Sequence, residues 1–424
     1  MRIYAGGRPV VLDGRKQNRK TRLLSVVLLF GCALAAVSQE VRQEQTSTGG
    51  FLERWGSSDT VSGAVFGTND LWDSTYKDWQ IWKGQHHLPI TVGAYNWFHI
   101  NNGGPNASGY GIPGLGGTYF WYVDADPRLA LNNATVSAVG AEVEARFRES
   151  SDKFRSYFYG ANAWLYQAYA YADTPVGRFM GGQIWKRFGL DWDESWWGDV
   201  QYFDGLKLDT GYGFSWENTW HPTDGNRFKL DSFVQYFISQ PDVSGSLVGA
   251  NPQSVPGAQE RNVGVIRLVP TWQLTADSSL ALGVSGLAGE IRNLTPASGD
   301  TSRLAWAADA TYTYGHFKVF GEVDQSFGVI NPNRYVSGGP SDRITDTEVG
   351  AAYQYGPVTY RLAWSAGFDA NPSGHQYLWV PGVTVALTKN VTLYAEYVNW
   401  NVTNCADKRT VFENGFQLAL NWRL

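Results

Sequence analysis

The sequence predicts an all-β fold, a transmembrane antiparallel β-barrel of about sixteen strands. From about residue 89 to residue 424, apolar and polar residues alternate within short runs. Tight polar turns and longer loops alternately connect one run to the next. Tyr and Trp gather at the ends of these runs, as they do where a barrel meets the two bilayer interfaces. Beyond the amino-terminal region, no segment is apolar for long enough to cross a bilayer as a helix, so strands must cross it.

The alternation is clearest in the hairpin that spans residues 302–327. Trp306 falls on one face of its first arm, and Arg303 and Asp309 fall on the other, as a side-chain period of two requires. A turn at Gly315 leads into a second arm with the same alternation. A soluble β-sandwich alternates in the same way, but the aromatic residues at the strand ends favour a membrane barrel.

Hairpins read back from the carboxyl end give the number of strands. The expected strands lie near residues 410–424, 391–402, 376–388, 357–368, 344–355, 316–327, 302–314, 279–291, 261–275, 227–239, 211–222, 178–188, 154–171, 134–148, 117–126 and 89–99. They make sixteen, an even number that leaves both ends of the barrel-forming chain at the periplasmic rim. Residues 60–67 and 76–83 are two further candidates, which would make eighteen. A barrel of either size encloses a lumen wide enough for water and small solutes.

The amino terminus predicts export. Five basic residues between Arg15 and Arg22 precede an apolar run over residues 23–36. Residues 36–38 form a small-x-small cleavage site, so residues 1–38 are expected to be a secretory signal peptide. The basic patch begins unusually late, at Arg15. It stays open whether the residues before it come from a start codon upstream of the natural one. Cleavage and lipid attachment at Cys32, as in a lipoprotein, is the alternative.

Two parts are expected beyond the leader. Residues 39–88 form an N-terminal periplasmic segment that is partly disordered, and residues 89–424 form the transmembrane barrel. Cleavage after residue 38 leaves 27 of the 34 basic and 38 of the 39 acidic residues, a formal net charge of −11, which disfavours a nucleic-acid partner. Cys405 is then the single remaining cysteine, so no internal disulfide is expected. Nothing in the sequence indicates a cofactor.

Two segments and the hairpin pattern resemble a known family. In the closing strand apolar and polar residues alternate: Phe416, Leu418, Leu420, Trp422 and Leu424 against Gln417, Asn421 and Arg423. The segment QIWKRFG at residues 183–189 leads from a strand into a long loop. From about Ile90 onward the chain resembles the bacterial outer-membrane porins of about sixteen strands. The resemblance implies an outer-membrane location in contact with its lipid, a homotrimer, assembly by the barrel-assembly machinery, and a water-filled channel for small hydrophilic solutes.

The third external loop is the candidate pore constriction. It spans about residues 189–210, and in porins this loop folds inward and narrows the lumen. Acidic residues and tryptophans are interleaved along it: Asp191, Trp192, Asp193, Glu194, Trp196, Trp197, Asp199, Asp204 and Asp209. Lys207 is the single basic residue among them. Carboxylates around a narrow passage favour cations, because the low-dielectric walls focus the field.

A basic wall is expected opposite this loop. The alternation places eight basic side chains toward the lumen: Arg146, Arg148, Arg227, Lys229, Arg261, Arg267, Arg303 and Arg361. On the lipid face near the midplane each such charge would cost roughly 2 to 4 kcal/mol, whereas water in the lumen solvates it. Acid facing base across the constriction would set up a transverse field that favours polar solutes over apolar ones.

Three other functions stay open. A saccharide-selective porin fits the loop, because indole faces stack on sugar rings while carboxylates and guanidinium groups bind hydroxyls. A barrel-embedded hydrolase needs a nucleophile with a converging His and carboxylate, and the six His are scattered with no serine elbow, so no catalytic residues and no enzyme are expected. A plugged receptor needs a larger amino-terminal domain than the residues before Ile90 provide.

The His86–His87 pair has no further ligands at suitable spacing, so no metal site is expected.

Overall fold

The computed structural model describes most of the predicted barrel. The described residues are 86–87, 90–101, 114–131, 133–150, 163–190, 199–203, 210–222, 227–239, 258–293, 301–327, 343–370, 373–388, 390–404 and 409–423. The chain divides into two compact units, Met1–Gly49 and Gly50–Leu424, and every described residue belongs to the second. The predicted leader and nearly all of the N-terminal segment lie outside the described residues, as do the two extra strand candidates.

The described residues are almost all in strands. The elements are β1 (His86–His87), β2 (Ile90–Asn101), β3 (Gly114–Ala125), β4 (Arg128–Ala130), β5 (Ala138–Ser150), β6 (Ala163–Thr174), β7 (Gly177–Trp185), α5 (Val200–Phe203), β8 (Thr210–Trp220), β9 (Phe228–Ser239), β10 (Ala258–Thr275), β11 (Ser278–Asn293), β12 (Thr301–Tyr314), β13 (Phe317–Phe327), β14 (Ile344–Tyr355), β15 (Val358–Ala370), β16 (Ser373–Thr388), β17 (Val391–Asn404) and β18 (Arg409–Arg423). Among the described residues, no helix is long and apolar enough to cross a membrane.

Sixteen of these strands form one closed antiparallel barrel. Each strand pairs with the next along the chain, except that β3 pairs directly with β5. The first barrel strand, β2, pairs with the last, β18, from Gly93↔Arg423 to Asn101↔Gly415, and this pairing closes the barrel. The two short strands lie outside the closed ring: β4 pairs with the start of β5, and β1 pairs with β4. The prediction of a sixteen-stranded all-β barrel is confirmed.

Burial alternates along the strands as the sequence predicts. In β12, Leu304 and Trp306 are 51% and 42% exposed, whereas Arg303 and Asp309 are 1% and 9% exposed. Antiparallel strands place alternate side chains on opposite faces. The exposed positions therefore form the outer face, and the buried charged positions line the inner face. The apolar exterior and polar interior are the reverse of a soluble barrel and match a membrane-spanning one.

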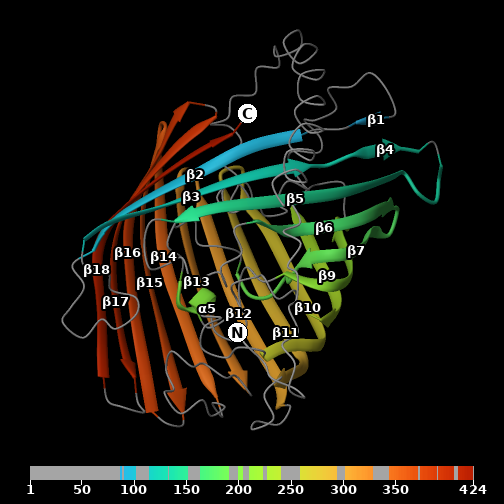
Figure 1. Ribbon diagram of the computed structural model, residues 1–424. Coiled ribbons are helices and arrows are strands. Elements are labelled where there is room, and N and C mark those ends of the chain that lie inside the picture. Colours follow the sequence, from blue (N-terminus) through green and yellow to red (C-terminus); the bar gives the residue numbers. More distant parts are fainter. Residues whose placement is uncertain are drawn as a thin grey trace, which may run out of the picture. The chain divides into compact units, whose positions relative to one another are not determined.

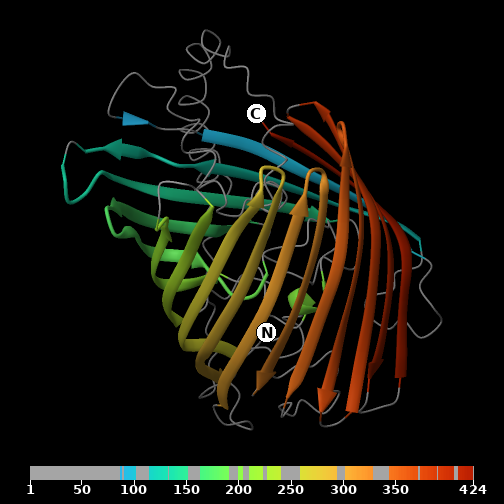
Figure 2. The same cartoon turned by 180° about the vertical axis from the view of Figure 1, so that it is seen from behind.

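The two rims differ in the length of their connections. At one rim β10–β11, β12–β13 and β14–β15 are joined by two-residue turns. Gly315 and Gly356 sit in these turns with φ of 54° and 56°, a conformation that glycine adopts without steric cost. At the other rim the connections are longer, among them residues 186–209 between β7 and β8. Figures 1 and 2 show the strands following one another around the barrel in chain order. Short turns are periplasmic and long loops external in outer-membrane barrels.

Three sequence predictions about strands need correction. The strand predicted at residues 154–171 is β6, at Ala163–Thr174, which continues past residue 171, while residues 154–162 lie outside the described residues. The strand predicted at 178–188 ends at Trp185. Arg261 does not share the inward face of Arg267. A β-bulge interrupts the register between Arg261 and Gly264. Asn262 there has φ of 53°, so the alternation shifts by one residue.

As a result Glu260 is buried and Arg261 is exposed. Arg261 pairs across the strands with Glu290, which is also exposed. A simple count of odd and even positions cannot detect a bulge, because the extra residue has no signature in the polar and apolar pattern.

Candidate functional site

The third loop leaves the barrel wall after β7 and runs along the inner face. Three of its backbone N–H groups donate to side chains of the wall. Arg187 N–H donates to Gln235 Oε1 at 2.7 Å, Gly189 N–H to Ser285 Oγ at 3.1 Å, and Leu190 N–H to Glu322 Oε2 at 2.9 Å. The acceptors come from β9, β11 and β13, every second strand, so the start of the loop crosses the inner face of the wall from β9 to β13.

The loop is attached again at its helical turn. α5 lies against β14, β15 and β16, on the inner side of the barrel in both views (Figures 1 and 2). Val200 N–H donates to Ser365 Oγ on β15 at 3.1 Å, and Asp199 and Val200 are 1% and 0% exposed. A loop that starts at β7 and docks on β15 spans the interior. The predicted inward fold of the third loop is confirmed.

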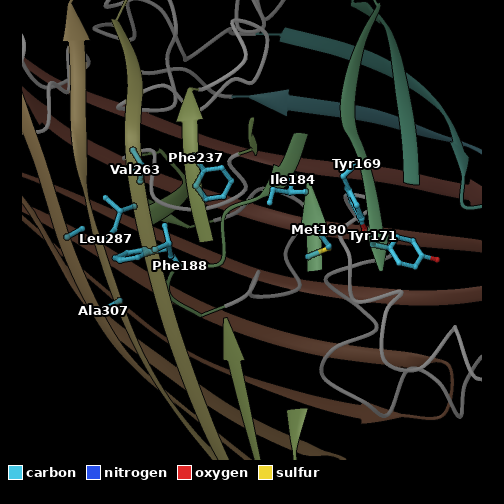
Figure 3. Close-up of a cluster of buried hydrophobic side chains, with 11 residues drawn as sticks. Tyr169, Tyr171, Met180, Ile184, Phe188, Phe237, Val263, Leu287 and Ala307 are labelled. Atoms are coloured by element: carbon cyan, nitrogen blue, oxygen red, sulfur yellow. The ribbon is translucent and has the colours of Figure 1, made fainter. Parts of the chain in front are cut away.

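An apolar patch on the inner wall receives the start of the loop. Figure 3 shows Phe188 beside Leu287, with Val263 and Phe237 close by. These side chains belong to one buried cluster: Tyr169, Tyr171, Met180, Ile184, Phe188, Phe237, Val263, Val265, Leu287, Ala305 and Ala307. Apolar groups facing a water-filled lumen are costly unless something covers them. Phe188 covers part of this patch, so the hydrophobic effect holds the loop to the wall.

Charged groups flank this patch. The carboxylate of Glu260 on β10 forms ion pairs with both Lys186 and Arg303, and all three side chains are buried. Arg187 Nε lies 3.7 Å from Glu217 Oε1, a looser pair. Burying a charge without a partner would cost roughly several kcal/mol of folding free energy. These ion pairs offset that cost for the buried basic groups.

An acidic patch lines the wall on β3 and β5. Asp124 lies directly opposite Glu144 in the strand pairing, Glu142 lies two residues before Glu144 on β5, and Asp126 directly follows the end of β3. Arg146 Nε lies 2.6 Å from Glu144 Oε1, and its guanidinium carbon lies 3.2 Å from the centroid of the Tyr166 ring. Tyr166 packs edge-on against Trp185, with ring centroids 5.0 Å apart.

A second acidic patch faces the lumen on β13 and β14. Glu322 lies opposite Glu348 in the pairing, and Asp324 lies opposite Asp346. All four are at most 5% exposed. Like charges directly opposite each other on neighbouring strands are destabilising. The α5 segment of the third loop lies against β14, so this patch is beside the docked loop.

Several basic side chains of the inner wall lie beside a carboxylate. Arg267 makes two hydrogen bonds to Asp309, at 2.6 and 3.1 Å, and Arg361 Nη2 lies 3.2 Å from Glu396 Oε1. The bidentate pair is the stronger geometry, because two parallel N–H donors fit one carboxylate. These pairs place a base beside an acid on β10, β12, β15 and β17.

The structure places only some of the predicted site residues. Arg146, Arg267, Arg303 and Arg361 are buried on the inner face, and Asp199 is buried beside α5. Arg227 is exposed just before β9, at the rim with the short turns, and Lys229 lies near it, 3.1 Å from Asp231. Arg148 lies in β5, but its side chain is outside the described residues, as are Asp191, Trp192, Asp193, Glu194, Trp196, Trp197, Asp204 and Asp209.

Several residues of the site were not predicted from the sequence. Glu260, Gln235, Ser285, Glu322 and Ser365 are the wall groups that hold the loop. The alternation placed Glu322 on the inner face but gave no reason to connect it with a loop 132 residues away. Within the described ranges, no group of His, Cys, Asp and Glu is arranged to hold a metal ion.

Comparisons with known proteins connect this fold to porins. A scan against protein-family models finds no match, and a search of curated proteins finds none. Solved structures do match. The outer membrane channel DcaP of Acinetobacter baumannii has a TM-score of 0.57 and 16% identity, covering 81% of this chain and 99% of that one.

Two further structures match over a similar extent. Salmonella typhi OmpF, in complex with daunomycin, has a TM-score of 0.58 and 12% identity over 80% of this chain and 98% of that one. The anion-selective porin from Comamonas acidovorans has a TM-score of 0.52 and 12% identity over 80% and 100%. The chain therefore has the fold of bacterial outer-membrane porins.

Proposed function

We propose that this protein is an outer-membrane porin, a water-filled channel for the passive diffusion of small hydrophilic solutes. The observation that carries the proposal is the closed barrel with an apolar exterior and a charged interior, crossed by an inward-folded third loop. A wide barrel with a polar interior conducts water and solutes. Reconstitution in a planar bilayer tests it. Stepwise increases of conductance support a channel, and a bilayer that stays sealed refutes it.

The channel is proposed to favour cations. Among the described residues, thirteen carboxylates and seven basic side chains are buried. Fixed negative charge in a narrow low-dielectric passage raises the local concentration of cations. The porin fold does not set the sign of selectivity, since one of the matching structures is an anion-selective porin.

The reversal potential in a roughly tenfold gradient of KCl measures this preference directly. We expect a potential close to the equilibrium potential of K⁺, not to that of Cl⁻. The excess of carboxylates leads to this expectation, and an anion-selective potential would contradict it.

A preference for saccharides is the second proposal. In support, Arg146 stacks on Tyr166 and Tyr166 packs on Trp185, so aromatic faces and hydrogen-bonding groups lie together on the inner wall. Sugars offer apolar ring faces and hydroxyls, which such groups bind. Oligosaccharides added to a single open channel should raise its current noise or block it briefly. Unchanged current at millimolar sugar would reject this proposal and leave the general channel standing.

The remaining functional expectations have their support in the fold and the sequence. We expect a homotrimer, targeting by a signal peptide at residues 1–38, and insertion by the barrel-assembly machinery through the closing strand. The closing strand has the expected alternation, with Phe416 and Leu418 64% and 48% exposed and Gln417 buried. A hydrolytic activity is not expected. Cross-linking of the native membrane protein tests the trimer, and the amino-terminal sequence of the mature protein tests the leader.

A further inference from the structure

Two oppositely charged side chains face outward near the external end of β10 and β11. Arg261 lies directly opposite Glu290 in the strand pairing, and both side chains are exposed. The outward positions farther along β10 are apolar, among them Ile266 and Leu268. A charge on this face is costly near the bilayer midplane and costs little near an interface. The position of the pair along the strands therefore decides which surroundings it meets.

The pair lies near the level of the external headgroups. Glu290 comes four residues after Gly286, which pairs with Ile266 at the middle of β10. Four residues span about 13 Å along a strand, or about 10 Å along the bilayer normal at a tilt of about 35–45°. The apolar band ends about 12 Å from its midplane. A long side chain such as that of Arg261 extends its charged end toward water, so its guanidinium reaches the headgroups.

A β-bulge turns this guanidinium outward. The strand register shifts between Arg261 and Gly264, and Asn262 between them has φ of 53°. Bulges at the rims of barrels re-aim side chains. The amide of Asn262 joins two neighbouring strands: Tyr236 Oη donates to its Oδ1 at 3.0 Å, and its Nδ2 donates to Glu290 Oε2 at 3.4 Å. Glu290 is thus bound to Asn262 and not to Arg261.

The protein leaves the charge of Arg261 without a counter-ion. Glu290 lies across the strands from it, yet no ion pair joins the two, and with the residues that the structure describes Arg261 makes no hydrogen bond. The inward-facing Arg267 and Arg303, by contrast, each bind a carboxylate. A guanidinium presents a planar fork of N–H donors that matches the oxygens of a phosphate group. Arg261 is therefore available for such a group.

The outer wall directly below the pair is low. Gly264 and Gly286 face outward, and Ala288 lies opposite Gly264. A Cβ atom at Gly264 would meet nothing nearer than the Ala288 carbonyl at 3.9 Å, and one at Gly286 would make only an ordinary contact at 3.5 Å. Larger side chains stand on both sides: Tyr236 on β9 and Leu304 on β12 are 46% and 51% exposed. A strip of small residues thus leads from Arg261 toward the midplane.

We propose that Arg261 binds the phosphate of a lipid in the external leaflet, and that an acyl chain of this lipid lies on the strip of Gly264, Ala288 and Gly286. The charge of the guanidinium is complementary to a phosphate, and its depth is that of the headgroups. The strip below it has the apolar surface that a chain attached to that headgroup would cover. The proposal rests on the proposed membrane function for the depth of the site, but the binding is measured without a channel recording.

Native mass spectrometry of the full chain in a non-ionic detergent tests the binding, with a phosphatidic acid as the added lipid. The native protein should take up this lipid in a saturable way. Arg261→Gln should weaken the affinity roughly tenfold, because a charge-assisted contact to the phosphate is lost. Glu290→Gln should strengthen the affinity, because it removes a negative charge beside the phosphate. Arg343→Gln is the matched control: Arg343 is also exposed, directly before β14 at the same rim, and its loss should leave the affinity unchanged.

The variants at the charged pair can each contradict the proposal. An Arg261→Gln protein that binds phosphatidic acid as tightly as the native protein would overturn it. An equal loss of affinity in Arg343→Gln would overturn it as well, since any basic group at the rim would then serve. Gly264→Leu places a side chain on the strip and should weaken binding several-fold. Native affinity in Gly264→Leu would overturn the acyl-chain contact.

Two further ligands identify what the site binds. A diacylglycerol with the same chains lacks the phosphate and should bind much more weakly, and inorganic phosphate at millimolar concentration should not displace phosphatidic acid. Displacement by inorganic phosphate would reject a lipid as the ligand. The same spectra report the number of chains in each particle. If Arg261→Gln changed that number but not the lipid bound per chain, this face would belong to a subunit interface, and the proposal would be wrong.

Failure of the proposed function would look different. A native protein that leaves a planar bilayer sealed would refute the channel. The affinities for phosphatidic acid would still decide whether Arg261 holds a phosphate.

Discussion

A charge placed on the outer face of β10 should destabilise the protein by an amount that depends on its position along the strand. Ile266 and Leu274 both point outward, at 50% and 53% exposure. Ile266 lies at the middle of β10, and Leu274 lies next to its last residue. The two are eight residues apart, about 26 Å along a strand. With a strand tilt of about 35–45°, that is about 20 Å along the bilayer normal.

The apolar band of such a barrel is about 25 Å tall, so its edge lies about 12 Å from the midplane. Ile266→Arg therefore puts a guanidinium in hydrocarbon, at a cost of about 2 to 4 kcal/mol, whereas Leu274→Arg reaches the interface and costs about 0 to 1 kcal/mol. Equilibrium unfolding in lipid vesicles by denaturant, followed by Trp fluorescence, gives both free energies of unfolding. Equal costs at the two positions, or a neutral Ile266→Arg, would refute the assignment of this face to lipid.

Two further predictions concern the inner wall and a turn. Asp309→Asn should destabilise the barrel by about 3 to 5 kcal/mol, because it removes the carboxylate that binds the buried Arg267 guanidinium through two hydrogen bonds. Asp309→Asn with Arg267→Met should recover much of this in the same unfolding assay, and a double variant as unstable as the single one would contradict the prediction. Gly315→Ala should cost about 1 kcal/mol, since φ of 54° strains alanine. A matched Gly286→Ala, at a position without positive φ where a Cβ makes only an ordinary contact, separates that strain from the loss of glycine itself.

The fold was largely predictable because its rule is local. Each strand needs only a period of two and a turn, and both are written in neighbouring residues, as in the hairpin of Arg303, Trp306 and Gly315. The energy that enforces the rule is also local, since one misplaced residue moves a charge into hydrocarbon. Failures occurred where the chain departs from the rule. The bulge at Asn262 reversed the placement of Arg261, and β7 ended early where the loop turns inward.

The site was less predictable because its contacts are not local. The sequence identified the third loop from its order among the hairpins, and its inward fold followed from the resemblance to porins. It did not identify the acceptors on the wall. Ser285 and Glu322 look like ordinary inward residues of β11 and β13, and only the path of the chain brings them to Gly189 and Leu190. The apolar side chains that pack with Phe188 also conflict with a simple expectation of a polar lumen.

The proposed channel function makes two opposite demands on the inner wall of this barrel. A conducting lumen calls for charged, hydrated side chains, whereas a docked loop calls for buried apolar contacts and fixed hydrogen bonds. The structure separates them: the apolar cluster lies on β6, β7 and β9–β12, where the loop begins, and an acidic patch lies on β13 and β14, beside α5. Glu322 belongs to the acidic patch and also binds the loop. It therefore links the charge of the acidic patch to the attachment of the loop, so a substitution there should change both, whereas a substitution of Glu396 should change the charge alone.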